Sequence, residues 1–285
     1  MRIGFIGAGR VGSSLGKFLR LNGADISGYY SRSASSALAA AEFVGADCFG
    51  SIAELCASSG VIVLTVPDGE LKSVYESLAA EDINGRLLCH CSGAMSSDEV
   101  FDGIEKRGAH GCSVHPLFPV SSIYSSYKEL GKAYFCLEGS REGTLFWQDT
   151  LVPLGVHVRV IDSAVKSRYH AACTVMSNLV CALADESLSL MLSCGFEKDE
   201  ALAALRPLAE SNLNGIFAAD PSTALTGPVE RNDVETVRRH LDCLTDPSDR
   251  NIYAAASLRL AEMAQRRHPE RDYSQLTELL QNAGA

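Results

Sequence analysis

One predicted helix near residue 170 carries several side chains that can hold or move a proton. At about 100° per residue, four of them fall within about 60° of one another, flanked by Tyr169 and Asn178: Lys166, His170, Cys173 and Ser177. An amine or imidazole whose pKa lies near neutral can act as a general acid or base. We therefore take Lys166, His170 and Asn178 as candidate catalytic residues, with Lys166 or His170 as the proton donor, and Ser177 as a candidate substrate contact.

The rest of this helix is apolar between Ala171 and Leu192, so we expect it to be buried. A polar stripe on a buried helix needs partners, because an unpaired buried polar group costs roughly 1–3 kcal/mol. The stripe would find such partners if it lined a substrate cleft. It would find them equally if its residues were hydrogen-bonded in the interior of a domain or dimer interface, and both interpretations stay open.

A glycine triplet near the N-terminus indicates a phosphate site. Gly7, Gly9 and Gly12 follow a short apolar strand at GxGxxG spacing and open a predicted helix. The first glycine permits a tight turn, the second lets the backbone approach a pyrophosphate, and the third lets the helix pack closely on the strand. Phosphates bind there on the free N–H groups of the helix N-terminus. The turn could exist without a ligand, but its strand–helix–strand context favours a dinucleotide site that includes Ala8, Arg10 and Val11.

The end of the second predicted strand discriminates between dinucleotides. An NAD site expects an acidic residue about 20 residues after the glycines, to bind the ribose 2′-hydroxyl. Here that place holds Ser31, Arg32 and Ser33, with no carboxylate. A guanidinium flanked by hydroxyls suits a 2′-phosphate, so we expect NADP; an exposed arginine without a ligand is the alternative.

Strand–helix alternation continues to about Asp162 and predicts an α/β fold with a doubly wound parallel sheet. Ligands of such sheets bind beyond the carboxyl ends of the strands. Three further segments end predicted strands there. We assign Thr65, Val66, Pro67, Ser92 and Gly93 to the cofactor, and His115 and Pro116 to the substrate.

Beyond Asp162 almost every segment has helical periodicity. We predict a Rossmann domain over residues 1–162 and a helical substrate or dimerisation domain over residues 163–285. A polar connector between two of these helices contains Thr226, a candidate substrate contact, next to the turn at Gly227-Pro228. The apolar helix also predicts a homodimer, because obligate interfaces resemble a core cut in half.

Composition bounds the class of protein. The 285 residues are 46% hydrophobic and 21% charged, with a formal net charge of −10, which argues against nucleic acid as a partner. No uninterrupted apolar run approaches a membrane span, and no signal-peptide pattern is present, so we expect a cytoplasmic protein without a membrane partner. None of the ten cysteines forms a CxxC pair. Cys89, His90 and Cys91 lack a standard zinc spacing, and we expect no metal.

With these motifs placed, the chain resembles a superfamily of two-domain dehydrogenases and reductases. The superfamily includes 6-phosphogluconate dehydrogenase, β-hydroxyacid dehydrogenases, ketopantoate reductase and pyrroline-5-carboxylate reductase. The chain is most similar to a family of NADP oxidoreductases with a helical domain of unknown function (2520 type). The segments that carry the resemblance are GFIGAGRVGSSL, YSRS, HCSGA, SVHPLFPVSS, KSRYHAACTVMSN and ALTGPVERNDVETVRRHL.

The resemblance implies an N-terminal Rossmann domain, a C-terminal helical domain and hydride transfer. Lys166 lies where the hydroxyacid dehydrogenases place a catalytic lysine, whereas His170 replaces their asparagine four residues on. We expect an NADP(H)-dependent oxidoreductase acting on a small carbonyl, hydroxy or imine compound that bears a carboxylate. The alternative is an NADP(H)-binding sensor or regulatory protein without turnover.

Overall fold

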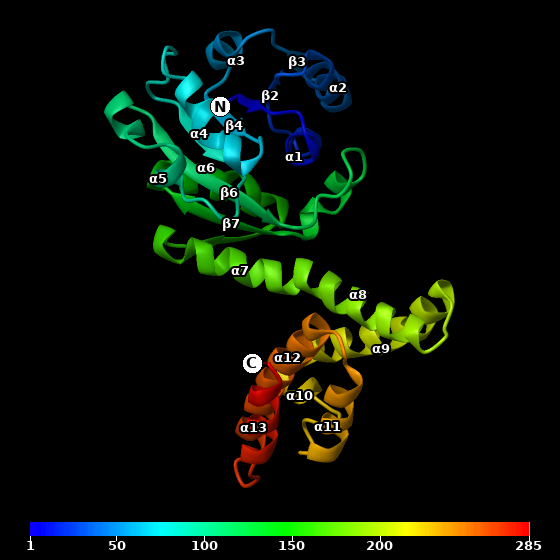
Figure 1. The fold of residues 1–285 in the computed structure, drawn as a ribbon. Helices are drawn as coiled ribbons and strands as arrows, with labels where there is room; N and C mark the ends of the chain where they lie inside the picture. Colours follow the sequence, from blue (N-terminus) through cyan, green and yellow to red (C-terminus); the bar gives the residue numbers. More distant parts are fainter. Residues whose placement is uncertain (285) are drawn as a thin grey trace. The chain divides into compact units, whose positions relative to one another are not determined.

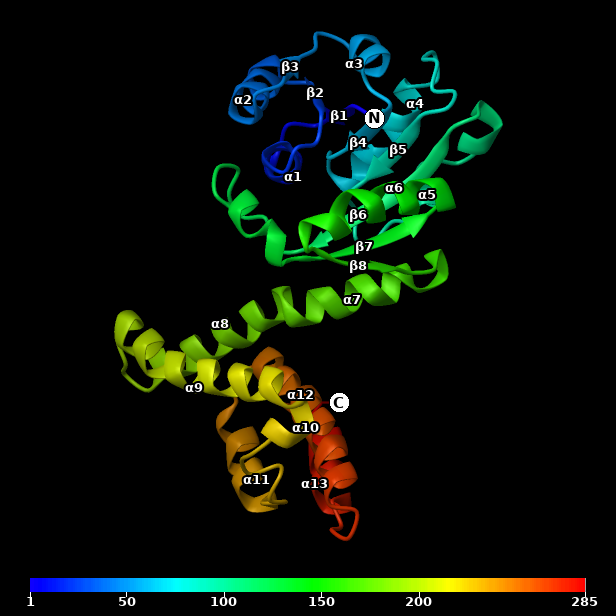
Figure 2. The same cartoon turned by 180° about the vertical axis from the view of Figure 1, so that it is seen from behind.

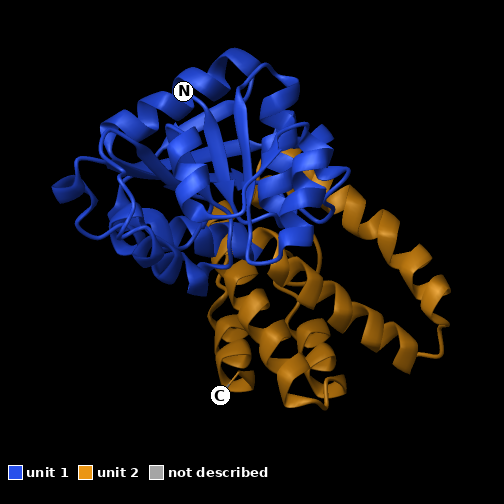
Figure 3. Ribbon diagram, turned by 90° about the horizontal axis from the view of Figure 1, so that it is seen from above, with its two compact units in different colours: residues 1–175 blue, residues 176–285 orange. Residues whose placement is uncertain are grey.

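The protein, represented by a computed structural model, divides into two compact units, residues 1–175 and 176–285 (Figure 3). The structure describes residues 1–284. The units meet between Val175 and Met176, whereas our expected domain boundary lies earlier, at Asp162–Ser163. Each unit is described separately below.

The first unit is built on an eight-stranded sheet in the order β3-β2-β1-β4-β5-β6-β7-β8, whose strands are all labelled in Figure 2 and are seen from the other side in Figure 1. Its strands are β1 (Ile3–Ile6), β2 (Ile26–Tyr30), β3 (Asp47–Cys48), β4 (Val61–Leu64), β5 (Leu87–His90), β6 (His110–Leu117), β7 (Tyr134–Gly139) and β8 (His157–Val160). The order of the first six strands is the Rossmann order. The sheet is not wholly parallel as expected, because β7 pairs antiparallel with β6 and parallel with β8. The starts of β7 and β8 therefore lie at the same sheet edge as the carboxyl ends of β1 to β6.

Helices cover both faces of this sheet, which confirms the predicted α/β doubly wound class. They are α1 (Arg10–Leu21), α2 (Ala34–Val44), α3 (Ile52–Ser58), α4 (Leu71–Ser77), α5 (Ser97–Val100), α6 (Arg141–Leu151) and α7 (Lys166–Met176). One core packs α1, α2 and α6 on the sheet around Phe5, Trp147 and Leu137. The other packs α3, α4 and α5 around Ile62, Leu64 and Phe101.

Residue patterns predict two helices of this unit, over Gly69–Leu78 and Ser97–Arg107, and both are shorter in the structure. The first would be capped by Asp68, but this stretch begins as a 3-10 turn and Asp68 makes no cap bond. The stretch Ser97–Arg107 is broken at Gly103, which adopts a φ of 70° that other residues rarely adopt.

The second unit is helical, as predicted. Its helices are α8 (Asn178–Ser193), α9 (Lys198–Ala218), α10 (Pro221–Ala224), α11 (Val234–Cys243), α12 (Pro247–Arg267) and α13 (Ser274–Ala283). Helices α11, α12 and α13 enclose a separate core around Val237, Ala261 and Leu276 (Figure 2). Asp233 caps α11 by accepting a hydrogen bond from the Thr236 N–H at 3.0 Å, as its position predicted.

The long apolar helix differs most from expectation. It is interrupted at Ser177, which separates α7 from α8, and no residue of α8 is buried in the described chain, so this chain alone does not provide the expected burial. By length and composition alone, the stretch Ser163–Ser193 is apolar enough to cross a membrane. Core and interface helices of soluble proteins pass the same test. The exposed apolar residues continue onto α9, where Leu208 is 64% exposed and Phe217 is 73% exposed.

Candidate functional site

The glycine turn between β1 and α1 has the geometry of a phosphate cradle. Gly7 has a φ of +108°, and a Cβ there would lie 2.8 Å from the Thr65 carbonyl. A Cβ on Gly12 would lie 2.4 Å from Thr65 Oγ1, so this glycine lets α1 approach β4 closely. Nothing lies within 4 Å of a Cβ built on Gly9, and α1 has neither a side-chain cap nor an acidic residue in its first turn. The uncapped start of α1 thus borders open space at Gly9, whereas Gly12 is buried against Thr65.

A cavity of about 380 Å³ extends from this turn across the ends of β2 and β4. Most of the residues assigned to the cofactor line it: Gly7, Ala8, Gly9, Ser31, Arg32, Thr65, Val66 and Pro67. Ser33 lies outside the lining and caps α2, where it accepts a hydrogen bond from the Ser36 N–H. The sequence analysis missed Glu70, which also lines the cavity and has Oε2 3.5 Å from Arg32 Nη1. A carboxylate is therefore present after all, contributed by a later segment.

The hydroxyl of Ser92, at the end of β5, makes three hydrogen bonds. Its Oγ donates to Asp68 Oδ2 at 2.8 Å and accepts from the N–H groups of Ala94 and Met95. Its own N–H donates to Nδ1 of the buried His90. Burial lowers the pKa of His90 to about 3, so this ring is neutral at pH 7. Ser92 therefore shapes the loop that presents Gly93.

The last three strands present one polar face, which α7 contacts. Paired residues of neighbouring strands form rows on this face, because side chains alternate along each strand. The first row joins Ser113 to Glu138, and the second joins His115, Cys136 and Arg159. The opposite face is apolar and carries Val114, Phe135 and Leu137 in the core around Trp147.

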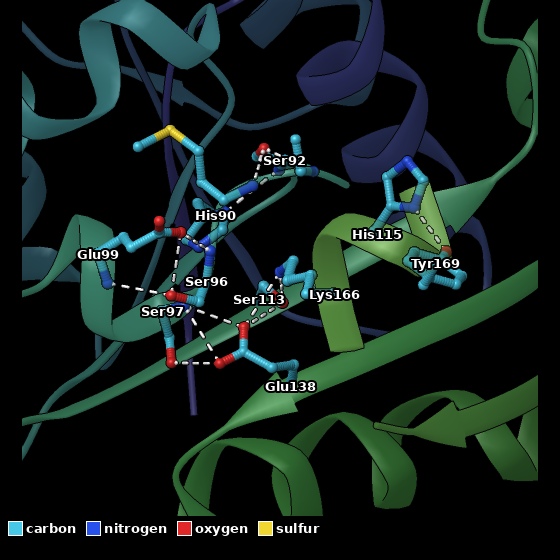
Figure 4. Close-up of polar contacts among 12 residues, drawn as sticks. His90, Ser92, Ser96, Ser97, Glu99, Ser113, His115, Glu138, Lys166 and Tyr169 are labelled. Carbon is cyan, nitrogen blue, oxygen red and sulfur yellow. Dashed lines mark hydrogen bonds and ion pairs between the residues drawn. The ribbon is translucent and has the colours of Figure 1, made fainter. Parts of the chain in front are cut away.

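Lys166 is anchored on the first row. Its Nζ donates to Ser113 Oγ and lies 3.1 Å from Glu138 Oε2, and the side chains of the ion pair are each only 2% exposed (Figure 4). Glu138 also accepts from the Ser97 N–H at 2.9 Å and from the hydroxyls of Ser97 and Ser113. Burial lowers the pKa of Lys166, and Glu138 opposes that shift. This network fastens the start of α7 to the sheet.

The second row brings His115 against Tyr169, one helical turn beyond Lys166. The Tyr169 hydroxyl lies 2.7 Å from His115 Nδ1, and Figure 4 shows the two side chains facing each other. Burial, reinforced by the nearby charges of His170 and Lys166, lowers the pKa of His115 to about 4, so its ring is neutral at pH 7. Burial raises the pKa of Tyr169, so the phenol keeps its proton. With both groups neutral, the bond runs either from the Tyr169 hydroxyl to Nδ1 or from a protonated Nδ1 to the Tyr169 oxygen, according to the tautomer of His115.

Gly93 completes this cluster by having no side chain. A Cβ there would lie 2.5 Å from His170 Cδ2 and 2.8 Å from His115 Nε2. His115 Nε2 therefore faces the loop at the end of β5. The structure thus brings together Gly93, His115, Tyr169 and His170 from three distant segments.

The other predicted residues have these places. Pro116 is buried in β6 beside His115. Ser177, Asn178 and Thr226 belong to the second unit, and their substrate or catalytic roles stay predictions. Glu138 was missed because its strand has a weak pattern, although a lone carboxylate between apolar residues was a signal. Tyr169 was noted only as a flank of the polar stripe.

The cysteines near this site have other partners. Cys112 donates to Cys89 at 3.3 Å, and Cys89 also accepts the indole N–H of Trp147 at 3.1 Å. Within residues 1–284, no three His, Cys, Asp or Glu side chains are grouped to hold a metal.

Comparison with known families agrees with this architecture. Residues 1–116 match the Rossmann-like domain, and residues 133–260 match a domain of unknown function, DUF2520. The predicted combination of these two domains is confirmed. The chain matches no curated protein.

Solved structures are similar over nearly the whole chain. Protein TM1727 from Thermotoga maritima is 26% identical with a TM-score of 0.73, and the match covers 93% of this chain and 99% of that one. The putative NADP oxidoreductase BF3122 from Bacteroides fragilis is 23% identical with a TM-score of 0.74, over 92% and 98% of the respective chains. A reductive aminase from Aspergillus terreus, in complex with NADPH and ethyl-5-oxohexanoate, is 16% identical with a TM-score of 0.60, over 99% and 93%.

The buried ion pair generates a stability prediction. We expect Lys166→Met to lower the free energy of unfolding by about 3–5 kcal/mol, because it leaves the Glu138 carboxylate buried without its counter-charge. Adding Glu138→Gln should restore at least half of that loss, because the amide still accepts from Ser97 without carrying a charge. The measurement is urea unfolding. Lys132→Met, at the exposed pair with Glu129, is the control and should cost less than about 1 kcal/mol. Equal losses at the two lysines would contradict the role of burial.

Proposed function

We propose that this protein is an NADP(H)-dependent oxidoreductase that transfers hydride between the cofactor and a small carbonyl, hydroxy or imine compound. One arrangement carries the proposal. The glycine turn and the His115–Tyr169 pair both lie at the ligand-binding edge of one sheet, at the ends of β1 and β6. Two strands separate β1 from β6, so these ends are roughly 14 Å apart at ordinary strand spacing. A dinucleotide bound at the turn can extend along this edge toward His115.

The residues present fit NADP. The open space at Gly9 and the uncapped start of α1 suit the pyrophosphate. Arg32, 82% exposed at the cavity wall, suits the 2′-phosphate together with Ser31. The negative charge of Glu70 repels an added phosphate. A preference for NADP therefore requires that the attraction between Arg32 and the 2′-phosphate exceed this repulsion. When bound, the cofactor supplies or accepts the hydride, and the protein supplies orientation and a proton.

His115 and Tyr169 supply that proton. Hydride addition to a carbonyl or neutral imine leaves an anion that is a far stronger base than phenolate. The Nε2–H of His115 gives its proton to this anion, while Nδ1 takes the proton of the Tyr169 hydroxyl. His115 stays neutral throughout, and the Tyr169 phenolate is reprotonated from solvent after turnover. The alcohol or amine product has then gained one hydride and one proton.

In this scheme Lys166 positions the residues around it and does not donate the proton. Its ammonium is held by Ser113 and Glu138, which fixes the helical turn that carries Tyr169 and His170. Its positive charge also helps to keep His115 neutral. His170, beside Gly93, borders the space where the substrate's reacting atom would lie.

The comparisons support this class of activity. One similar structure is described as an NADP oxidoreductase, and another is a reductive aminase holding NADPH and a keto ester. At the identities observed, these neighbours support the fold directly and the chemistry by analogy.

We further propose that a second copy of this chain covers the apolar surface of α8 and α9. Within the described chain α8 has no buried residue, and its exposed leucines recur at helical spacing: Leu179, Leu183 and Leu190. A surface of this kind is typical of obligate interfaces.

Cofactor preference tests Arg32. We expect Arg32→Ala to weaken NADPH binding about tenfold or more and to change NADH binding little, because only NADPH carries the 2′-phosphate. Glu70→Gln should act in the opposite direction and strengthen NADPH binding. Fluorescence titration of NADPH and NADH measures both. Equal losses for the two cofactors in Arg32→Ala would contradict the phosphate role, and failure of NADPH to bind would remove the proposed function altogether.

The pH dependence of NADPH oxidation over a panel of ketones and imines tests the proton donor. Activity needs a protonated donor, so it falls as pH rises through the donor's pKa. The raised pKa of Tyr169 places that fall above about 10, and the pKa of His115 near 4 leaves the profile flat from about pH 5 to 9. A lone histidine donor would instead lose activity between about pH 6 and 8.

Tyr169→Phe should lower kcat about 100-fold or more while NADPH affinity stays unchanged. Tyr253→Phe is a matched control, because it removes a hydroxyl that lies 2.7 Å from His240 in the second unit. Full turnover by Tyr169→Phe would overturn this donor. NADPH binding without oxidation of any panel compound would favour the sensor alternative.

Sedimentation tests the homodimer. We expect the native protein to sediment with the mass of two chains, and Leu183→Glu to sediment as one chain, because a buried carboxylate disrupts an apolar interface. Leu21→Glu, at a leucine of α1 that is 63% exposed, should leave the mass of two chains unchanged. A single-chain mass for the native protein would contradict the dimer.

A further inference from the structure

A second cavity adjoins the His115–Tyr169 pair and takes no part in the proposed proton transfer. It measures about 410 Å³, within the size range of small-molecule sites, and Tyr169 forms part of its wall. The remaining wall comes from the polar face of β6–β8, near the starts of β7 and β8. The pair His115–Tyr169 therefore lies between this cavity and the loop at Gly93.

The wall of this cavity is mostly apolar. Leu117, Tyr134 and Ile161 contribute to it, and no aspartate or glutamate does. Leu117 is 37% exposed and Tyr134 is 51% exposed, so both side chains are available to a ligand. Such walls favour a carbon skeleton and exclude a strongly hydrated cation.

One charged side chain lines the cavity, and it is Arg159 of β8. Within residues 1–284, the Arg159 side chain makes no hydrogen bond or ion pair, so the five N–H donors of its guanidinium remain available. Arg159 shares the second row with Cys136 and His115, with one strand between its own and that of His115, or roughly 10 Å along the sheet. A planar guanidinium opposite apolar walls is suited to a carboxylate, which it binds in a bidentate manner.

We propose that this cavity binds the substrate's carbon skeleton and that Arg159 binds a carboxylate on it. The inference rests on the proposed oxidoreductase function and deepens it, because it names the substrate class as oxo acids or imino acids with an apolar chain. The carboxylate lies at Arg159, and the reducible carbon lies at His115 and Tyr169. Arg159 is then the residue that selects acids over neutral ketones.

Matched acid and ester substrates test this selection. The probes are 2-oxohexanoate and 5-oxohexanoate, each compared with its methyl ester in NADPH oxidation. We expect the native protein to have a kcat/KM at least tenfold higher for one acid than for its ester. Arg159→Gln should remove this preference by raising KM for the acid, and it should leave kcat/KM for the ester unchanged. Arg159→Lys should retain part of the preference, because it keeps the positive charge but loses the paired N–H donors that bind a carboxylate in a bidentate manner.

Arg168→Gln is the matched control. Arg168 lies on α7, is exposed, and does not line the cavity, so its loss removes the same charge without removing the contact. The preference for acid should survive in this variant. Reduction of both esters as fast as their acids by the native protein would overturn the proposal, as would an equal loss for acid and ester in Arg159→Gln.

Calorimetry with 5-oxohexanoate in the presence of NADP⁺ separates this inference from the proposed function. Binding to the native protein and to Arg168→Gln, with loss of at least tenfold affinity in Arg159→Gln, supports the carboxylate site even if no compound is reduced. Absence of binding to the native protein, or unchanged binding to Arg159→Gln, overturns it even if NADPH is oxidised with other substrates.

Discussion

The ion pair between Lys166 and Glu138 is the contact on which the candidate active site depends. Burying two charges is costly, and attraction offsets that cost only when further hydrogen bonds complete the pair. Here Ser97 and Ser113 provide them, so the pair has essentially one stable geometry. The pair fixes the start of α7 on β6 and β7, and it thereby determines which helical residue meets His115. A charge pair that touches no substrate can in this way set the geometry of proton transfer.

Local sequence signals predicted the parts of the fold that depend on short-range constraints. The turn at Gly7, Gly9 and Gly12, the buried strands and the cap of α11 at Asp233 follow from residue type at neighbouring positions, and the structure has them where expected, whereas Asp68 does not cap α4. The domain combination also followed, because its motifs are spread over most of the chain. Prediction succeeded where a residue's role is decided by its immediate neighbours.

Long-range pairing could not be predicted in the same way. The sequence gives no sign that β7 reverses direction, that Glu138 will face Lys166, or that Glu70 will approach Arg32. The apolar run of α8 indicated burial, yet hydrophobicity alone does not say whether a residue is covered by its own chain. The role of Tyr169 could not be predicted for a related reason. It depends on the contact with His115, which the sheet brings to this side of the helix.

Where α7 contacts the polar face of β6–β8, the structural repeat of the helix and that of the strands differ in length. One helical turn advances about 5.4 Å, whereas two residues of a strand advance about 6.6 Å. Lys166 over the first row and Tyr169 over the second are consecutive steps of this contact. Lys166 and Tyr169 are three residues apart and advance about 4.5 Å along the helix, so the difference from the strand repeat is about 2 Å at this step. A difference of this size limits how many consecutive rows one helix can contact. Tyr169, over the second row, is also the residue of α7 that lines the cavity on the polar face.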